Sequence, residues 1–161
     1  MISRRAGEAL AELDLPVQFT QQPNPIPPGL QVDRRVAILL LLVAKSNAAG
    51  ASWKGLHLLN WVVRDRRHAE ILVSIANGQD IPDRAIVRFE PAFERALDLA
   101  HGLGYLERKQ SGAYRLTPTG QSYVDAIHGS DAFEVERALL DLLTGKVSQK
   151  LVDRMVEWRE R

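Results

Sequence analysis

The stretch from Glu90 to Gly120 constrains the fold of this chain more than any other part of the sequence. Pro91 suits the first position of a helix, where its missing N–H loses no hydrogen bond. Apolar residues then recur at helical spacing: Phe93, Ala96, Leu97, Ala100 and Leu103. Gly102 and Gly104 can adopt the left-handed backbone that ends a helix. We therefore expect a helix that begins at Pro91, buries one face and ends near Gly104.

A β-hairpin and a second helix are expected next. Residues 105–107 and 113–116 have the composition of two short strands, and residues 110–112 are turn formers. Thr117 and Pro118 suit the N-cap and first position of a following helix. The order helix, hairpin, helix is typical of a winged helix. The sequence thus predicts a mainly α-helical fold with a small β-hairpin wing, a winged helix-turn-helix with extra N- and C-terminal helices.

The whole chain of 161 residues divides by composition into three parts. Residues 1–32 would hold an N-terminal helix and a Pro-rich arm, residues 33–128 the winged-helix domain, and residues 129–161 a C-terminal helical extension. The arm, Leu15 to Leu30, contains five of the eight prolines, which favours an extended conformation. Such an arm can lie on its own domain, add to a partner or serve as a plain linker.

Two tryptophans in one expected helix, Trp53 and Trp61, are the most informative residues of the central part. Ser52 can cap that helix. Its apolar stripe leaves no direction in which both rings can reach the centre of the buried face, so at least one is expected near a surface or interface. The alternative, two core tryptophans between helix layers, stays open.

Other elements are expected around that helix. Asp33 can cap a helix whose residues 36–43 are apolar nearly all round. A further helix is expected over residues 66–77, ended by Asn77 and Gly78, and residues 85–89 are expected to form a strand that pairs with the wing.

The C-terminal part predicts two more helices. Asp131 with Glu134 resembles a capping box, and Ser148 can cap the last helix. That last helix carries an apolar side that a short terminal segment is not expected to bury alone. Its candidate interface residues are Leu151, Met155 and Trp158.

Composition excludes several function classes. The chain has no cysteine and therefore neither disulfides nor thiolate zinc sites. No secretory pattern opens it, and its longest apolar run, Val36 to Ala44, is too short to cross a bilayer, so we expect a cytoplasmic protein without membrane contact. The four histidines are scattered, and no pair of carboxylates has an acid–base spacing. We expect no catalytic residue, no cofactor site and no metal site.

Binding to DNA is only weakly supported. Net charge is +1, and the helix before the wing, which enters the major groove in the usual arrangement, carries Glu94 and Asp98. Two groups of cations are enough for a few phosphate contacts; the alternative, an ordinary solvated surface, stays open. These candidates are Arg64, Arg66, Arg67, Arg108, Lys109 and Arg115.

Five runs of the sequence resemble the small middle component of bacterial ABC-three-component systems, the group that includes Lamassu-type antiviral defence. They are LLLLVAKSN, LHLLNWVVR, RFEPAFERALDLAHGLGYLER, AYRLTPTG and KVSQKLVDRMVEW, which together span roughly residues 33 to 158. The resemblance implies a subunit that accompanies an SMC/Rad50-like ATPase and a large effector, often a nuclease.

Two interpretations of function remain. The first is a non-catalytic accessory subunit that contacts its partners mainly through protein surfaces, with candidate interface residues Trp53 and Trp61. The second is a winged-helix transcriptional regulator that dimerises through the expected helices 131–143 and 148–160. Fold alone does not decide between them, because winged helices mediate both kinds of contact.

Overall fold

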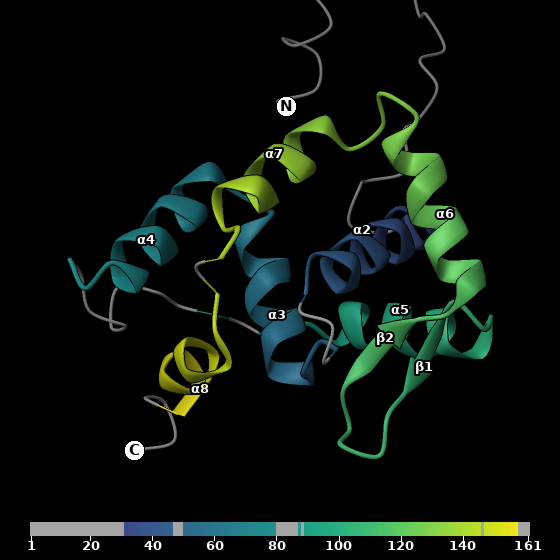
Figure 1. Ribbon diagram of the computed structural model, residues 1–161, viewed down its shortest axis with the longest axis horizontal. Helices are drawn as coiled ribbons and strands as arrows, with labels where there is room; N and C mark the ends of the chain where they lie inside the picture. Colours follow the sequence, from purple (N-terminus) through teal and green to yellow (C-terminus); the bar gives the residue numbers. More distant parts are fainter. Residues whose placement is uncertain (1–30, 47–49, 80–86, 88, 146, 158–161) are drawn as a thin grey trace, which may run out of the picture.

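The computed structural model describes residues 31–46, 50–79, 87, 89–145 and 147–157 (Figure 1). The expected N-terminal helix and the Pro-rich arm lie outside these residues. Within them the chain is mainly helical, with a two-stranded antiparallel hairpin. The elements in order are α2 (Val32–Lys45), α3 (Trp53–Val62), α4 (Arg66–Ala76), α5 (Pro91–Gly102), β1 (Leu106–Arg108), β2 (Tyr114–Leu116), α6 (Pro118–His128), α7 (Glu134–Leu142) and α8 (Gln149–Glu157).

Helix α2 is the centre of the fold. Its residues 36–43 are all buried, and it contacts α3, α5, α6, α7 and β2 (Figure 1). A run of eight apolar residues covers every side of a helix, so the helix is stable only when neighbours surround it. The expected cap by Asp33 is wrong: the helix begins at Val32, its N-cap residue Gln31 makes no side-chain cap, and Asp33 lies in the first turn. There the carboxylate still faces the positive end of the helix dipole.

The helix–hairpin–helix stretch forms as expected, except that Leu103, expected on the buried face, is the C-cap of α5 and is exposed. Pro91 occupies the start of α5, and Gly104 has φ of 74°, which lets the chain turn into β1. In the hairpin, residue 106 pairs with 116 and residue 108 with 114. Thr117 caps α6 by accepting a hydrogen bond from the Gly120 N–H at 3.1 Å. A β-carbon at Gly120 would collide with the Tyr105 carbonyl, so only glycine allows α6 to approach the start of the hairpin this closely.

The hairpin gains a third partner, but not the expected one. Val87 and Phe89 are not in a strand, and the rest of the expected strand lies outside the described residues. Instead Ala51, just before α3, forms an antiparallel bridge with Tyr114 through hydrogen bonds of 2.8 and 2.9 Å. Gly50 has φ of 101° and lies so close to the Tyr114 carbonyl that a side chain there would be strained.

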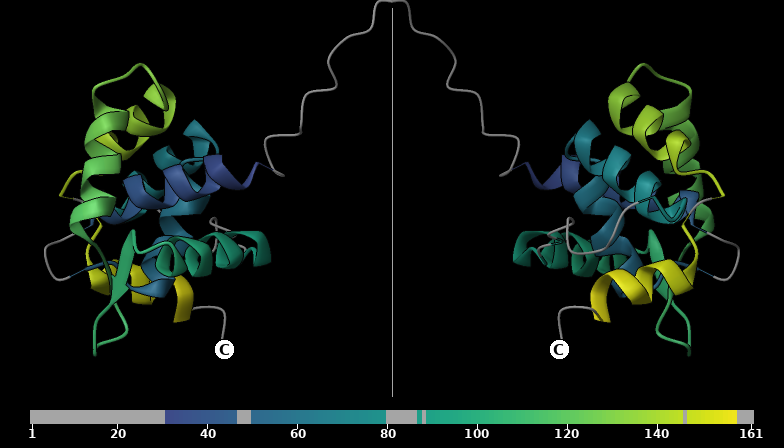
Figure 2. Two further views of the ribbon diagram at one scale, coloured as in Figure 1. Left: turned by 90° about the vertical axis from the view of Figure 1, so that its right-hand side faces the viewer. Right: turned by 90° about the vertical axis from the view of Figure 1, so that its left-hand side faces the viewer.

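The last two helices pack on the same core. Helix α7 contacts α2, α3 and α4, and α8 contacts α3. The expected capping box at Asp131 is wrong, because Phe133 is the N-cap of α7 in a left-handed conformation with φ of 58°. Ser148 does cap α8, since its Oγ accepts a hydrogen bond from the Leu151 N–H at 3.2 Å. Figure 2 shows α4 and α7 at one end of the molecule and α8 and the hairpin at the other.

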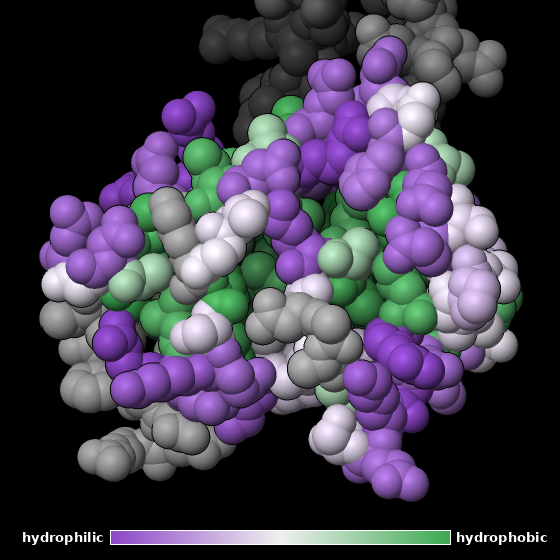
Figure 3. Space-filling view, in the orientation of Figure 1, coloured by the Kyte–Doolittle hydropathy of each residue, from purple (hydrophilic) through white to green (hydrophobic). Residues whose placement is uncertain are grey.

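The surface carries both polar and apolar residues. On the face seen in Figure 1, apolar side chains are visible between hydrophilic rims, and hydrophilic side chains cover the hairpin (Figure 3). Among the described residues, none of the helices has the length and apolar character needed to span a membrane.

Candidate functional site

Four rings from two helices and the segment before α5 form an aromatic face. Trp53 and Phe89 are stacked with ring centroids 4.8 Å apart, and both remain exposed, by 36% and 45%. His57 lies beneath them, at 4.6 Å from the Trp53 ring and 4.8 Å from the Phe89 ring. Phe93 on α5 closes the inner side at 5.2 Å from His57. We call these four residues the aromatic face.

A hydrogen bond fixes the base of the aromatic face. The side chain of His57 is fully buried, and its Nε2 lies 2.6 Å from Oε1 of Glu94 on α5. Burial lowers the pKa of His57 below its ordinary value near 6.5, and this outweighs Glu94, which acts to raise it. The ring is therefore neutral at pH 7, so Nε2–H donates to the Glu94 carboxylate. This bond joins α3 to α5 and limits the motion of the two outer rings.

Glu90, the N-cap residue of α5, is a second anchor next to Phe89. Its carboxylate forms ion pairs with Arg35 at 3.5 Å and with Arg64. These pairs hold the start of α5 between α2 and the end of α3. They also mean that Arg64, a candidate phosphate contact, already has a carboxylate partner.

The two tryptophans of α3 have different environments. The spacing predicted that at least one of them lies near a surface, and Trp53 does. Trp61 is only 8% exposed and stacks on His68 of α4, with ring centroids 4.1 Å apart and an interplanar angle of 13°. Nδ1 of His68 lies 2.8 Å from the Trp61 carbonyl oxygen. Trp61 is thus a core residue of the described chain, and Trp53 is the tryptophan that a partner can reach.

The candidate interface residues of the last helix divide differently. Leu151 and Met155 are buried within the chain, on a helix that packs against α3, so they are not surface residues in this structure. The expectation that this apolar side is left unburied is wrong for these two, because the turn at Gly145 returns the chain to α3. Trp158 lies outside the described residues.

The six candidate phosphate contacts do not form one surface. Arg64, Arg66 and Arg67 lie at the start of α4, whereas Arg108, Lys109 and Arg115 belong to the hairpin at the other end. At least three of the six are in ion pairs within the described part of the chain: Arg64 with Glu90, Arg66 with Glu70, and Arg115 with Glu107. The guanidinium of Arg108 lies over the Tyr114 ring, 5.8 Å from its centroid. These pairings reduce the charge available for phosphates.

Helix α5 also lacks the surface of a base-reading helix. Its exposed positions include Arg95, Asp98 and two leucines, Leu99 and Leu103. Glu94, expected to face outward, instead accepts the hydrogen bond from His57. One cation beside an acid and two apolar side chains is a poor match for phosphates and base edges.

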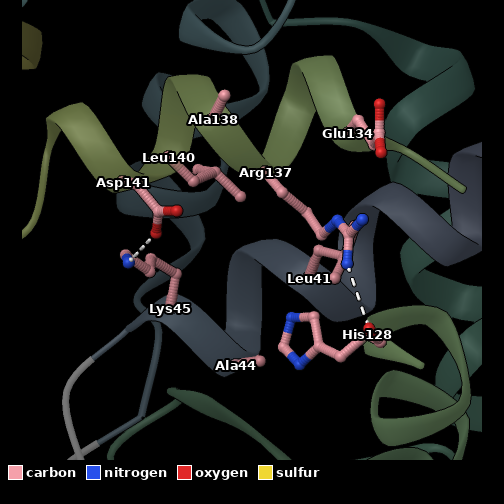
Figure 4. A pocket seen from close by; sticks show the side chains of 9 residues that line it. All are labelled: Leu41, Ala44, Lys45, His128, Glu134, Arg137, Ala138, Leu140 and Asp141. Carbon is pink, nitrogen blue, oxygen red and sulfur yellow. Dashed lines mark hydrogen bonds and ion pairs between the residues drawn. The ribbon is translucent and has the colours of Figure 1, made fainter. Parts of the chain in front are cut away.

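An open hollow of about 450 Å³ lies between α2, α6 and α7 (Figure 4). Its cations are engaged: Lys45 Nζ lies 2.7 Å from Oδ1 of Asp141, and Arg137 donates to the carbonyl oxygens of His128 and Ser130 at 3.3 and 3.1 Å. The described residues contain no group of three or more His, Asp or Glu side chains placed to hold a metal. The hollow therefore offers a polar rim without a recognisable catalytic arrangement.

Of the aromatic face and its supports, only Trp53 was predicted from the sequence as a site residue; His57, Phe89 and Glu90 were not. One local signal existed, because His57 follows Trp53 by four residues and so lies on the same side of the helix. Phe89 and Glu90 gave no such signal, since their partners are far away in the sequence. No protein family, curated protein or solved structure matches this chain.

Proposed function

We propose that this chain is a non-catalytic winged-helix accessory subunit that bridges an SMC/Rad50-like ATPase and a large effector in a bacterial defence complex in the cytoplasm. It makes at most weak, non-specific contact with DNA. The observation that carries the proposal is the aromatic face, in which Trp53 and Phe89 are exposed on a fixed base. The helix–hairpin order and the bridge between Ala51 and Tyr114 support the winged-helix assignment.

The aromatic face has the properties of a protein-binding hot spot. Tryptophan is enriched among the residues that carry most binding energy, and such residues bind best when their neighbours hold them in place. Here the stacking with Phe89 and the bond between His57 and Glu94 restrict the Trp53 ring before any partner arrives. Little ordering of side chains is then needed on binding.

A bridging subunit needs a second surface, and α7 supplies one. Val135, Ala138 and Leu142 are exposed at spacings of three and four residues, so they share one side of the helix. Val135 is 71% exposed and Leu142 is 46% exposed. An apolar stripe on an outer helix fits the helix-in-groove mode of recognition. We assign this stripe to the effector and the aromatic face to the ATPase.

Co-purification from the native source tests the proposal. Trp53→Ala should leave the chain folded but weaken its affinity for the ATPase more than tenfold. Truncating such an anchor commonly costs about 2 kcal/mol or more of binding free energy. Tyr123→Ala is the matched control, because Tyr123 is an aromatic residue of similar exposure on α6 and should have no effect. Val135→Asp with Leu142→Asp should release the effector and keep the ATPase. Recovery of neither partner with the unchanged chain would refute the proposal.

The runner-up is a winged-helix regulator that binds DNA. The observation that favours it is Arg108, a hairpin cation that lies over the Tyr114 ring and forms no ion pair with another described residue. A titration with duplex DNA at physiological salt separates the two. The subunit should bind weakly and without sequence preference. Sequence-selective binding in the nanomolar range typical of specific sites would favour the regulator.

A further inference from the structure

The aromatic face has a free polar group beside its rings. No hydrogen bond joins the indole N–H of Trp53 to another described residue. An exposed tryptophan whose N–H is available, next to a second exposed ring, is the arrangement that proline-rich segments bind: the rings pack on the prolines, and the N–H donates to a backbone carbonyl. The surface therefore fits an extended, uncharged, proline-rich ligand.

The chain itself contains such a ligand. The sixteen residues from Leu15 to Leu30 hold five prolines and no charged residue. Pro25 and Pro28 are three positions apart, which places both rings on one side of a polyproline helix with three residues per turn. A segment of this composition loses little conformational entropy when it binds in the extended form, because proline already restricts its backbone.

The segment is attached close to the aromatic face. It ends where α2 begins, and Arg35, one turn into α2, is 3.5 Å from the carboxylate of Glu90, the residue next to Phe89. In the polyproline form sixteen residues reach about 50 Å at 3.1 Å per residue. By comparison the 14 residues of α2 are only about 21 Å long. The segment can thus fold back and reach Trp53 without strain.

The charges around the aromatic face also suit an uncharged ligand. Two cations beside Phe89, Arg35 and Arg64, both contact Glu90, and the Glu94 carboxylate accepts from His57. These charges already have partners within the chain. A neutral proline-rich segment matches this surface better than an acidic or basic peptide does.

We propose that the segment from Leu15 to Leu30 docks on the aromatic face of its own chain, with its prolines against Trp53 and Phe89. This places an internal ligand on the surface that the ATPase would otherwise contact directly. The docking concerns the free chain alone, so it can be tested independently of the proposed function.

The full chain provides a direct test, because it contains no cysteine. Gln22→Cys introduces one attachment point for a nitroxide inside the segment. Docking should abolish the nuclear magnetic resonance signal of the Trp53 indole N–H, and reduction of the nitroxide should restore it. Trp53→Phe identifies that signal among those of the three tryptophans.

The matched control is the same labelled chain with Pro25→Gly and Pro28→Gly, which keeps the tether but loses the polyproline form. The Trp53 signal should persist in this control, since only random encounters remain. Equal loss of signal in both chains, or no loss in either, would overturn the proposal. A labelled chain mixed with an unlabelled, isotope-enriched one supplies the last arm: loss of signal there would place the contact between two copies and contradict docking within one chain.

Discussion

Helix α3 contributes the tryptophans of two tryptophan–histidine pairs, whose environments are opposite. In the first, Trp53 is exposed and His57 is buried; in the second, Trp61 is buried and His68 is partly exposed. The first pair lies on one helix and is covered by Phe89, whereas the second joins α3 to α4 across the turn at Asp65. The same two residue types thus form part of an exposed surface at one end of α3 and a core contact at the other. Position relative to neighbouring helices, and not residue type, decides the role.

The largest expected effect comes from the buried ring. Trp61→Ala should lower the free energy of unfolding by about 3–5 kcal/mol, because it removes apolar burial and leaves a cavity between α3 and α4. Trp53→Ala should cost far less, since that ring is already partly in water. Urea unfolding of both variants measures the difference. Equal losses of unfolding free energy in the two variants would contradict the assignment of Trp61 to the core and Trp53 to the surface.

The buried histidine of the first pair should make stability depend on pH. The pKa of His57 in the folded chain lies below 6.5, the ordinary value that applies to the unfolded chain. At a pH between the two pKa values, the unfolded chain therefore binds more protons than the folded chain. The contribution of His57 to the free energy of unfolding is therefore fully present above about pH 7. It falls as the pH decreases through 6.5, by at most about 1.4 kcal/mol per pH unit. His57→Phe should remove this contribution, as measured by urea unfolding from pH 5.5 to 7.5.

The control for this pH dependence is His68→Phe in the second pair. That variant retains His57 and should keep the slope. A His57→Phe chain with the same pH dependence as the unchanged chain would contradict the assignment. The slopes of the two variants must be compared with each other, because the other histidines remain in both.

Much of the fold was predictable because its signals are local. Ser52 caps α3, Pro91 begins α5 and Thr117 caps α6, and each acts on a backbone group within three residues. The misplaced features depend on distant partners. Ala51 bridges Tyr114 across more than sixty residues. The N-cap of α7 is Phe133, which packs against the core, and not Asp131.

The candidate site was predictable only in part, for the same reason. Helical geometry predicted that Trp53 and Trp61 cannot both reach the centre of the buried face, and in the structure Trp53 is exposed while Trp61 is buried. The bond between His57 and Glu94 spans 37 residues, and neither residue type signals it in the sequence. Local patterns therefore identified an unusual helix, while the contacts that make one end of it a surface came from α5 and the segment before it.

The next effect concerns the stacking that defines the aromatic face. A double-mutant cycle with Trp53→Ala and Phe89→Ala should give a coupling energy of about 0.5–1.5 kcal/mol, the range for aromatic pairs beyond their area burial. A cycle of Trp53→Ala with Tyr123→Ala is the reference, since no ring contact joins these two described residues. It should be additive within about 0.5 kcal/mol. Additivity in the first cycle as well would mean that the two rings do not support each other.

The smallest expected effect comes from the ion pairs beside the two tryptophan–histidine pairs. Glu70 pairs with Arg66 on the exposed side of α4, and Glu90 pairs with Arg35 and Arg64 next to Phe89. Glu70→Gln should cost only about 0.3–0.5 kcal/mol, as for exposed pairs four residues apart on a helix. Glu90→Gln should cost about 1 kcal/mol, because its less exposed carboxylate serves two arginines.

Salt distinguishes these two ion pairs further. At 1 M salt the screening length falls to about 3 Å, so the cost of Glu70→Gln should vanish in urea unfolding. Part of the cost of Glu90→Gln should remain, since the carboxylate is partly shielded from solvent and also fixes the start of α5 beside Phe89. If both costs vanish together, Glu90 is an ordinary surface charge. The exposed end of α3 would then owe its order to the His57–Glu94 bond and the ring stacking alone.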